Sequence, residues 1–334
     1  MSAQEEEIEV PTGAALAELE GHLWAIRPPV LRELFALAES GRFLEAYRVP
    51  PEAARRKGRP RKINGSVEIV GLHGVLMPLG FLGMLFGLEN PLDAFRREFD
   101  QALNDPEVGA IVIDVDSPGG VVDFIPETAA EISRARGDKP IVAVANTLAA
   151  SAAYWLASQA DEVVVTPSGE AGSIGVYAAH RDISGALEIA GIKNTLISAG
   201  RFKTEGNPFE PLSDEAREHI QQDVDAFYDM FTADVARGRQ VKQQTVREGF
   251  GEGRVLNAKD AVREGVADRV ETLTEAVARL TARSRGGATQ AEAEAGAETD
   301  PEAEAVAGAD DDTESVLTED EKRDVADVLL RLGV

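Results

Sequence analysis

Two hydrophobic periods alternate along the middle of the chain. Short apolar runs rich in valine and isoleucine are typical of buried strands, whereas apolar residues three or four positions apart are typical of helices. The predicted strands lie at 66–77 (one bent strand or a pair), 109–116, 141–145, 162–166, 172–177 and 193–198. The predicted helices lie at 91–103, 121–136, 183–190, 213–237 and 272–285, with a short helix and a strand within 254–270. Strand, helix and strand in succession predict right-handed crossovers, and therefore a mostly parallel α/β sheet with flanking helices.

The N-terminal part shows helical spacing instead. Apolar residues in 13–48 predict two short helices, and Pro28-Pro29 separates them because proline is tolerated in a first helical turn. A basic linker, 55–62, follows. We therefore assign 1–62 to an N-terminal helical segment with its linker and 63–283 to the α/β domain.

Residues 284–334 form the third predicted region. Beyond Arg285 the composition turns to alanine, glutamate, glycine and aspartate without apolar periodicity, which is typical of a disordered acidic tail. Helical spacing returns between Thr318 and Leu332 and predicts a short terminal helix. That helix fits a docking segment and a frayed terminus equally well.

Composition excludes several classes of function. The 334-residue chain has no cysteine, so it has no disulfide, thiolate metal site or cysteine nucleophile. A net charge of −25 argues against nucleic acid as a partner. The acidic N-terminus is unlike a secretory signal, and the apolar patch 76–88 is too short to span a membrane. We expect a cytoplasmic protein with no stable membrane anchor, metal or cofactor.

The segment from Pro140 to Ser158 carries the strongest candidate chemistry. Its valine-rich start predicts a strand that passes through Asn146-Thr147 into an alanine-rich helix, with Ser151 near the start of that helix. First-turn N–H groups there would stabilise an oxyanion, and small neighbours leave room for a polypeptide. From this stretch alone, an incidental serine in a tightly packed helix is an equal interpretation.

A second turn is expected beside this serine. Loops that leave the carboxyl ends of neighbouring parallel strands cluster on one edge, so Ser117-Pro118-Gly119-Gly120 should lie close to Ser151. Gly119 and Gly120 expose backbone N–H groups without a side chain, as an oxyanion hole requires.

The serine hydroxyl also needs a base. Among the histidines, His73 and His180 are the plausible choices, and Lys203 lies in a glycine-flanked loop after a predicted strand. A lysine serves as a general base where burial lowers the lysine pKa from ~10.4 toward ~7–8. From position alone, a solvated loop cation is the favoured interpretation of Lys203.

Four ordered blocks resemble a known family: 116–120, 147–154, 172–176 and 198–204. They are similar to the signal-peptide-peptidase A family of serine proteases, which uses a Ser-Lys dyad on the Clp protease/crotonase fold. The resemblance runs from about Ile69 to Val270. The roles it implies are nucleophile for Ser151, general base for Lys203, oxyanion donor for the N–H groups of Gly119 or Gly120 and of Ala152, and supporting hydroxyl for Ser173.

The residues after Ser151 depart from the family pattern, and an N-terminal segment resembles one branch of the family. The family usually has two glycines after the serine, whereas this chain has Ala152-Ala153, which keeps the N–H and narrows the site. Residues 23–37 resemble the segment that precedes the protease core in phage and prophage members. Those members cleave scaffold and capsid proteins, and often themselves, during head assembly.

The resemblance therefore implies a capsid assembly protease that works in the host cytoplasm or the immature phage head. Its implied partners are capsid and scaffold proteins and its own tail. The apolar loop 76–88 further predicts a homo-oligomer. Two alternatives stay open, namely a cellular signal-peptide-peptidase-like peptidase and a non-proteolytic crotonase-fold or scaffold protein.

Overall fold

The computed structural model describes residues 16, 19, 21–42, 61–63, 67–77 and 90–283. It has a mixed α/β architecture built on an eight-stranded sheet with the order β10-β8-β6-β4-β3-β2, to which β7 and β11 are joined beside β6. The strands of this sheet are β2 (Arg61–Ile63), β3 (Val67–His73), β4 (Ala110–Ser117), β6 (Ile141–Ala150), β7 (Glu162–Val165), β8 (Glu170–Gly172), β10 (Val255–Asn257) and β11 (Arg269–Val270). The predicted tail and its terminal helix lie outside the described residues.

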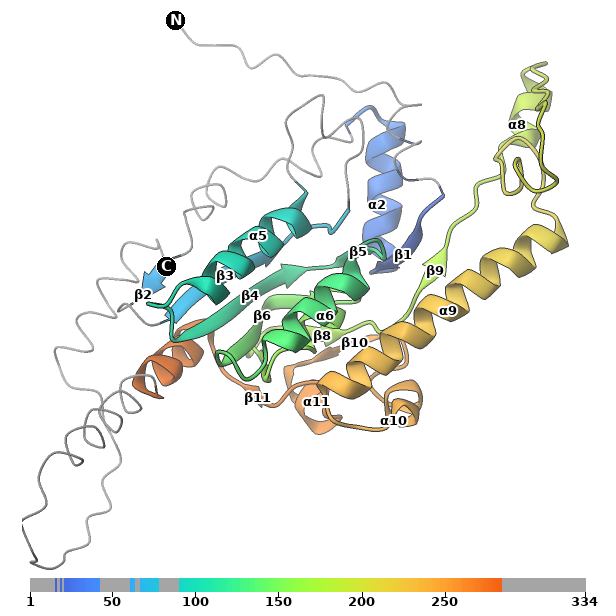
Figure 1. The fold of residues 1–334 in the computed structure, drawn as a ribbon. Coiled ribbons are helices and arrows are strands. Elements are labelled where there is room, and N and C mark those ends of the chain that lie inside the picture. Colours follow the sequence, from blue (N-terminus) through green and yellow to red (C-terminus); the bar gives the residue numbers. More distant parts are fainter. Residues whose placement is uncertain are drawn as a thin grey trace, which may run out of the picture. The chain divides into compact units, whose positions relative to one another are not determined.

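Most strands of the large sheet run parallel, as the sequence predicts. The pairs β3-β4, β4-β6, β6-β7, β6-β8 and β7-β11 are parallel, and the outer strands β2 and β10 pair antiparallel. The named helices are α2 (Pro28–Glu39), α5 (Pro91–Asn104), α6 (Ile125–Ala135), α7 (Ala152–Ala157), α8 (Ser184–Ile189), α9 (Asp214–Gly238), α10 (Gln243–Glu248) and α11 (Ala258–Arg263). A further helix covers 273–283. Figure 1 shows α5 and α6 running along one face of the sheet.

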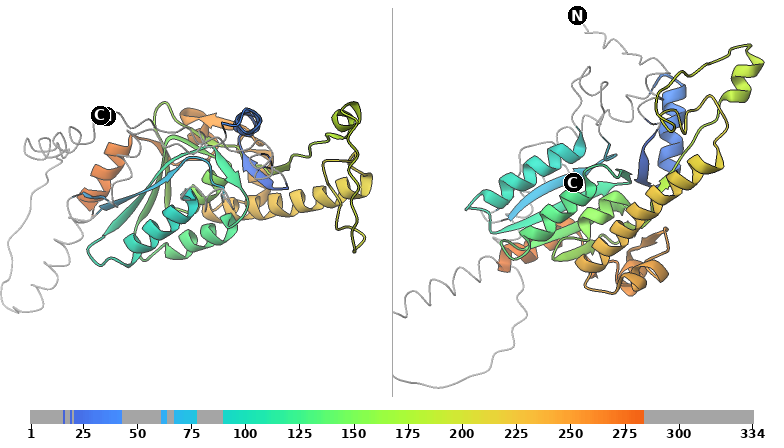
Figure 2. Two further views of the ribbon diagram at one scale, coloured as in Figure 1. Left: turned by 90° about the horizontal axis from the view of Figure 1, so that it is seen from above. Right: turned by 45° about the vertical axis from the view of Figure 1, so that its right-hand side comes forward.

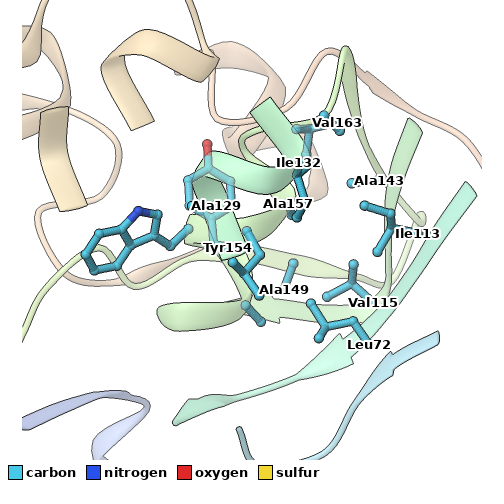
Figure 3. Packing of buried hydrophobic residues seen from close by; sticks show 14 of the residues in the cluster. Leu72, Ile113, Val115, Ala129, Ile132, Ala143, Ala149, Tyr154, Ala157 and Val163 are labelled. Atoms are coloured by element: carbon cyan, nitrogen blue, oxygen red, sulfur yellow. The ribbon is translucent and has the colours of Figure 1, made fainter. Parts of the chain in front are cut away.

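The core lies on both faces of the central strands. Alternate residues of β4 point to opposite sides, since successive side chains of a strand do. Ile113 and Val115 pack with α5, α6 and α7, whereas Val112 packs with the helix at 273–283. Figure 3 shows the first cluster, in which Ala129 and Ile132 of α6 lie with Tyr154 and Ala157 of α7. This packing holds α7, and the turn before it, in a fixed place against the sheet.

A second, smaller sheet lies beside the first. Its order is β5-β1-β9, and its strands are β1 (Leu23–Ile26), β5 (Gly119–Val121) and β9 (Tyr177–Ala178). Both pairings are antiparallel. The two views of Figure 2 keep β1 beside α2. The small sheet therefore brings the N-terminal segment onto the strand that follows the Ser117–Gly120 turn.

Three predicted elements differ from the structure. Residues 23–26 form a strand rather than part of a helix, because Gly21, with φ +79°, breaks the helical path and the backbone beyond it pairs with β5 and β9. Residues 193–198 are not a strand, because no neighbouring strand pairs with them and their side chains face solvent. The predicted strand at 172–177 divides into β8 and β9, since Ser173 takes a left-handed φ of +56° between them.

Within the described part of the chain, no helix has both the length and the apolar character needed to cross a membrane.

Candidate active site

Ser151 lies in a tight connection between strand β6 and helix α7. The strand runs to Ala150, longer than predicted, and the helix begins at Ala152, so the serine is the single residue between them. Its backbone has φ +57° and ψ −120°, a conformation that costs a non-glycine residue on the order of 1–3 kcal/mol. Such strain persists where the surroundings impose it, and it concentrates at functional sites.

The surroundings of Ser151 do impose this conformation. Its N–H donates to the carbonyl oxygen of Gly172 at 2.8 Å, and its carbonyl oxygen accepts from the N–H of Trp155 at 2.9 Å. The residue is only 1% exposed. Within the described chain, the buried Oγ of Ser151 has no hydrogen-bond partner, although most buried hydroxyls have one. The hydroxyl is therefore free to engage a group brought to it.

Helix α7 is anchored by its aromatic residues. Trp155 stacks on Phe231 of α9 with ring centroids 4.4 Å apart, and its Nε1–H donates to Asp234 at 2.8 Å. Tyr154 donates its hydroxyl hydrogen to the carbonyl oxygen of Val266 at 2.8 Å, and burial raises the pKa of this phenol. Tyr154 therefore stays a neutral donor, and α7 keeps its place under Ser151.

The Ser117–Gly120 turn lies next to Ser151, as predicted from strand order. A β-carbon at Gly119 would lie 3.0 Å from both the N of Ala152 and the O of Ala150. Gly119 has φ +96°, and its N–H donates to the Oγ of Ser117 at 3.2 Å. Ser117 in turn donates to the carbonyl oxygen of Gly74 at 2.6 Å, which fastens the turn to the residue after β3.

The predicted oxyanion donors are thus close together. Ala152 is the first residue of α7, so its N–H has no partner within the helix. Gly120 is paired with Ala25 of β1 and bridged to Leu76 on its other side. The N–H of Gly119 already donates to the Oγ of Ser117, so a carbonyl oxygen bound beside this turn would compete with that hydroxyl for it.

Ser173 and Lys203 lie in different surroundings. Ser173 is 6% exposed, follows the Gly172 that binds Ser151, and donates its N–H to the carbonyl oxygen of Arg254 at 2.8 Å. Lys203 is exposed in the turn between Gly200 and Gly206, and its N–H donates to the carbonyl oxygen of Gly200 at 3.2 Å. The structure brings Ser173 to the Ser151 turn but does not place Lys203 at hydrogen-bond distance from the serine hydroxyl.

Neither candidate histidine pairs with Ser151. The Nε2 of His180 lies 3.2 Å from the carbonyl oxygen of Asn207, and the Nε2 of His73 lies 3.1 Å from Asp114. Among the described residues, no group of three or more histidine, aspartate or glutamate side chains is arranged to hold a metal ion.

The sequence prediction missed the contribution of β1 to this region. Its residues 24–26 pair with 119–121, at the end of the Ser117–Gly120 turn, where the prediction had a helix. The available signal was the short stretch between Gly21 and Pro28, which is too short for a stable helix of its own.

Comparison with known proteins finds relatives named as peptidases. Residues 133–285 match the model described as Peptidase family S49. The chain is 33% identical over 222 residues to capsid assembly protease C of Escherichia phage lambda, covering 66% of this chain and 50% of that protein. It is 32% identical over 240 residues to head-tail preconnector protein GP5 of Enterobacteria phage P21, covering 70% and 47%.

More distant relatives come from cells. The chain is 31% identical over 170 residues to the chloroplastic serine protease SPPA of Arabidopsis thaliana, covering 51% of this chain and 25% of that protein. A solved structure of the 1510-N membrane-bound stomatin-specific protease in complex with a substrate peptide aligns with a TM-score of 0.41 at 16% identity, covering 64% and 79%. The chain spans about half the length of the two phage relatives that it matches.

Proposed function

The chain belongs to peptidase family S49, and from this premise we propose that it is a serine endopeptidase in which Ser151 is the nucleophile. The observation that carries the proposal is the conformation of Ser151, a strained and buried serine with an unpaired hydroxyl between β6 and α7. The N–H of Ala152 and the glycine turn lie beside it. Strain, an unsatisfied nucleophile and nearby amide donors together fit acyl transfer better than packing alone.

The proposed reaction follows from these groups. The Oγ of Ser151 attacks the carbonyl carbon of a peptide bond, and its proton passes to the amine of Lys203. The carbonyl oxygen becomes an oxyanion, which accepts hydrogen bonds from the N–H of Ala152 and of Gly119 or Gly120. Lys203 returns the proton to the leaving amine, and water then hydrolyses the acyl-serine bond. Ser173 is assigned to hold the lysine by its hydroxyl.

This mechanism requires Lys203 to move toward Ser151. The lysine belongs to the segment 184–206, which carries α8 and ends at Gly206. Five large apolar side chains of this segment face solvent: Ile189 (92% exposed), Ile192 (52%), Leu196 (40%), Ile197 (94%) and Phe202 (51%). Exposed apolar clusters of this kind mark interaction sites. We assign the cluster to contacts within a homo-oligomer, which would order the segment and carry Lys203 inward.

The phage relatives suggest the substrate. Two of them are named for capsid assembly and for the head-tail connection. We therefore assign this chain to the cleavage of capsid and scaffold proteins, and of its own tail, within the host cytoplasm or the immature head. The cellular relative named as a serine protease supports the peptidase activity without the phage substrate.

Co-expression tests both the proposed peptidase activity and the proposed substrates. The full chain is produced with the capsid and scaffold proteins encoded beside it, and a parallel culture produces Ser151→Ala. We expect shortened capsid or scaffold products only with the unsubstituted chain. Full-length partners in both cultures, together with cleavage of an unrelated unfolded protein, would keep the peptidase and reject the substrate. No Ser151-dependent cleavage of any polypeptide would reject the peptidase.

A further inference from the structure

Strand β1 occupies an unusual place for an N-terminal segment. It lies between β5 and β9, and its register places Ala25 opposite Gly120 and Trp24 opposite both Val121 and Tyr177. Two further backbone bonds extend the ladder: the N–H of Arg27 donates to Pro118 O at 3.0 Å, and the N–H of Val122 donates to Leu23 O at 3.1 Å. The chain therefore runs antiparallel along the whole oxyanion turn.

This strand reaches the edge of the candidate active site. A β-carbon at Gly119 would lie 2.2 Å from the carbonyl oxygen of Ala25 and 3.0 Å from the N of Ala152. The carbonyl oxygen of Ala25 and the N–H of Ala152, which is assigned to the oxyanion, therefore both lie next to the α-carbon of Gly119. The other edge of β5 is already used, because the N–H of Val121 donates to Leu76 O at 2.9 Å and the N–H of Leu76 donates to Gly119 O at 2.9 Å.

The side chains of β1 divide between two clusters. Ala25 is fully buried and belongs to the large core cluster that also includes Ala149 and Ala152. Trp24 and Ile26 point the other way and pack with α2 residues in a separate cluster that includes Met77 and Val121. The β1 residue in the large core cluster is therefore small, and Trp24 and Ile26 anchor the strand on its opposite side.

Ser151 Oγ and Tyr177 Oη both lack a hydrogen-bond partner in the described chain, and burial raises the pKa of Tyr177 to about 12. Tyr177 lies directly opposite Trp24. A strand present only for stability would be expected to pair such groups, because an unpaired buried hydroxyl costs ~1–3 kcal/mol.

We propose that β1 occupies the slot in which an extended substrate polypeptide binds, so that the arrangement described is self-blocked. The proposal rests on the proposed function and deepens it. A substrate adds to an exposed strand edge through main-chain hydrogen bonds, and β1 already fills the edges of β5 and β9 between which it lies. The polypeptide that replaces it is extended and carries a small side chain at the position of Ala25.

Release of the strand is then the step that opens the site. Trp24 and Ile26 hold it through the α2 cluster, so displacement requires this cluster to separate from Met77 and Val121. Protein substrates that supply a full strand can offset the loss of the backbone hydrogen bonds of β1, since they form the same bonds to β5 and β9. Peptides shorter than β1 cannot do so.

A reversible cross-link tests the proposal, because the chain has no cysteine of its own. Leu23 on β1 and Ala178 on β9 are directly opposite and half-buried, and opposed positions on antiparallel strands suit a disulfide. The double variant Leu23→Cys/Ala178→Cys is oxidised to lock β1 in place and reduced to release it. Each single-cysteine variant, treated with the same oxidant and reductant, controls for the substitutions.

We expect cleavage of an unfolded protein by the double variant to rise at least tenfold on reduction, with no such rise in the single variants. A second measurement needs no catalysis. In the Ser151→Ala background, a fluorescent peptide that copies residues 20–28 should bind the reduced double variant and not the oxidised one.

The outcomes separate the two proposals. Redox-gated peptide binding without any cleavage would keep the blocked slot and count against the peptidase. Equal cleavage, or equal peptide binding, by a fully oxidised and a reduced protein would overturn the blocked slot while leaving the peptidase intact. Absence of both binding and cleavage in either state would overturn the slot as well.

Discussion

The carbonyl oxygen of Ala25 lies directly against the α-carbon of Gly119, where a β-carbon would come within 2.2 Å of it. The N-terminal strand and the oxyanion turn are thus packed backbone to backbone. Gly119 also needs φ +96°, which only glycine adopts readily. Two independent constraints therefore select glycine at this position.

Alanine in place of Gly119 should disturb both the close contact with the Ala25 carbonyl oxygen and the positive φ of the turn. We expect Gly119→Ala to lose on the order of 1–3 kcal/mol of stability through overpacking and to lose Ser151-dependent cleavage at least tenfold. Thermal unfolding and a peptidase assay measure the two effects. Gly175→Ala is the matched control, since a β-carbon there meets no atom within 4 Å. Wild-type stability and activity in Gly119→Ala would show that the turn moves freely.

Most strands of the large sheet, and their mostly parallel arrangement, could be predicted because periodicity and crossover rules act locally. A buried apolar run such as 110–116 predicts a strand without reference to its neighbours. Ser213 marks the start of α9, because its hydroxyl oxygen accepts a hydrogen bond from the N–H of Ala216 at 3.1 Å. The approach of the Ser117–Gly120 turn to Ser151 follows from the same rules.

The rest depends on partners far away in the sequence. Residues 23–26 are a strand because β5 and β9 flank them, whereas the local pattern indicates only that the stretch is too short for a stable helix. Residues 193–198 show the opposite case, because a strand-like composition there finds no partner and stays irregular. The pairing of Ser151 with Lys203 remains a prediction from resemblance, since the lysine lies in solvent.

Asp268 should give the stability of the domain a pH dependence. Burial acts to raise the pKa of this carboxyl, but hydrogen bonds from Arg239 and from the N–H of Val163, with the charge of Arg239, together lower it. A lowered pKa in the folded state stabilises at pH above the unfolded value of ~3.9, and this contribution is lost as pH falls through the folded pKa.

We therefore expect Asp268→Asn to destabilise the domain by about 1–2 kcal/mol at pH 7, a value kept low because the carboxylate is 38% exposed. The difference from wild type should shrink below pH ~4. Denaturant unfolding at several pH values measures it, with the exposed Asp223→Asn of α9 as control. A difference that does not change with pH would contradict the assignment.

The apolar cluster on 184–206 should drive assembly. We expect the double variant Ile189→Ser/Ile197→Ser to sediment at lower mass than wild type and to lose cleavage in parallel, because both side chains are over 90% exposed in one chain. Its unfolding free energy should stay within about 0.5 kcal/mol. Met230→Ser, on α9 outside the segment and 39% exposed, is the control. Unchanged mass for the double variant would reject this surface as an interface.

The identity of the base gives the last prediction. Lys203→Ala should reduce cleavage by about 10²–10⁴-fold, the usual contribution of a general base, and nearly as much as Ser151→Ala, because groups that act as a unit lose most activity when either is removed. Lys203→Arg should be equally inactive, since a guanidinium does not release its proton in the accessible pH range. His180→Ala should keep most activity, because that imidazole lies 3.2 Å from the Asn207 carbonyl oxygen in an open turn. All variants are compared on one unfolded protein substrate after circular dichroism has established that each is folded. An active Lys203→Arg protein, or a folded but inactive His180→Ala protein, would show that another group takes the proton of Ser151.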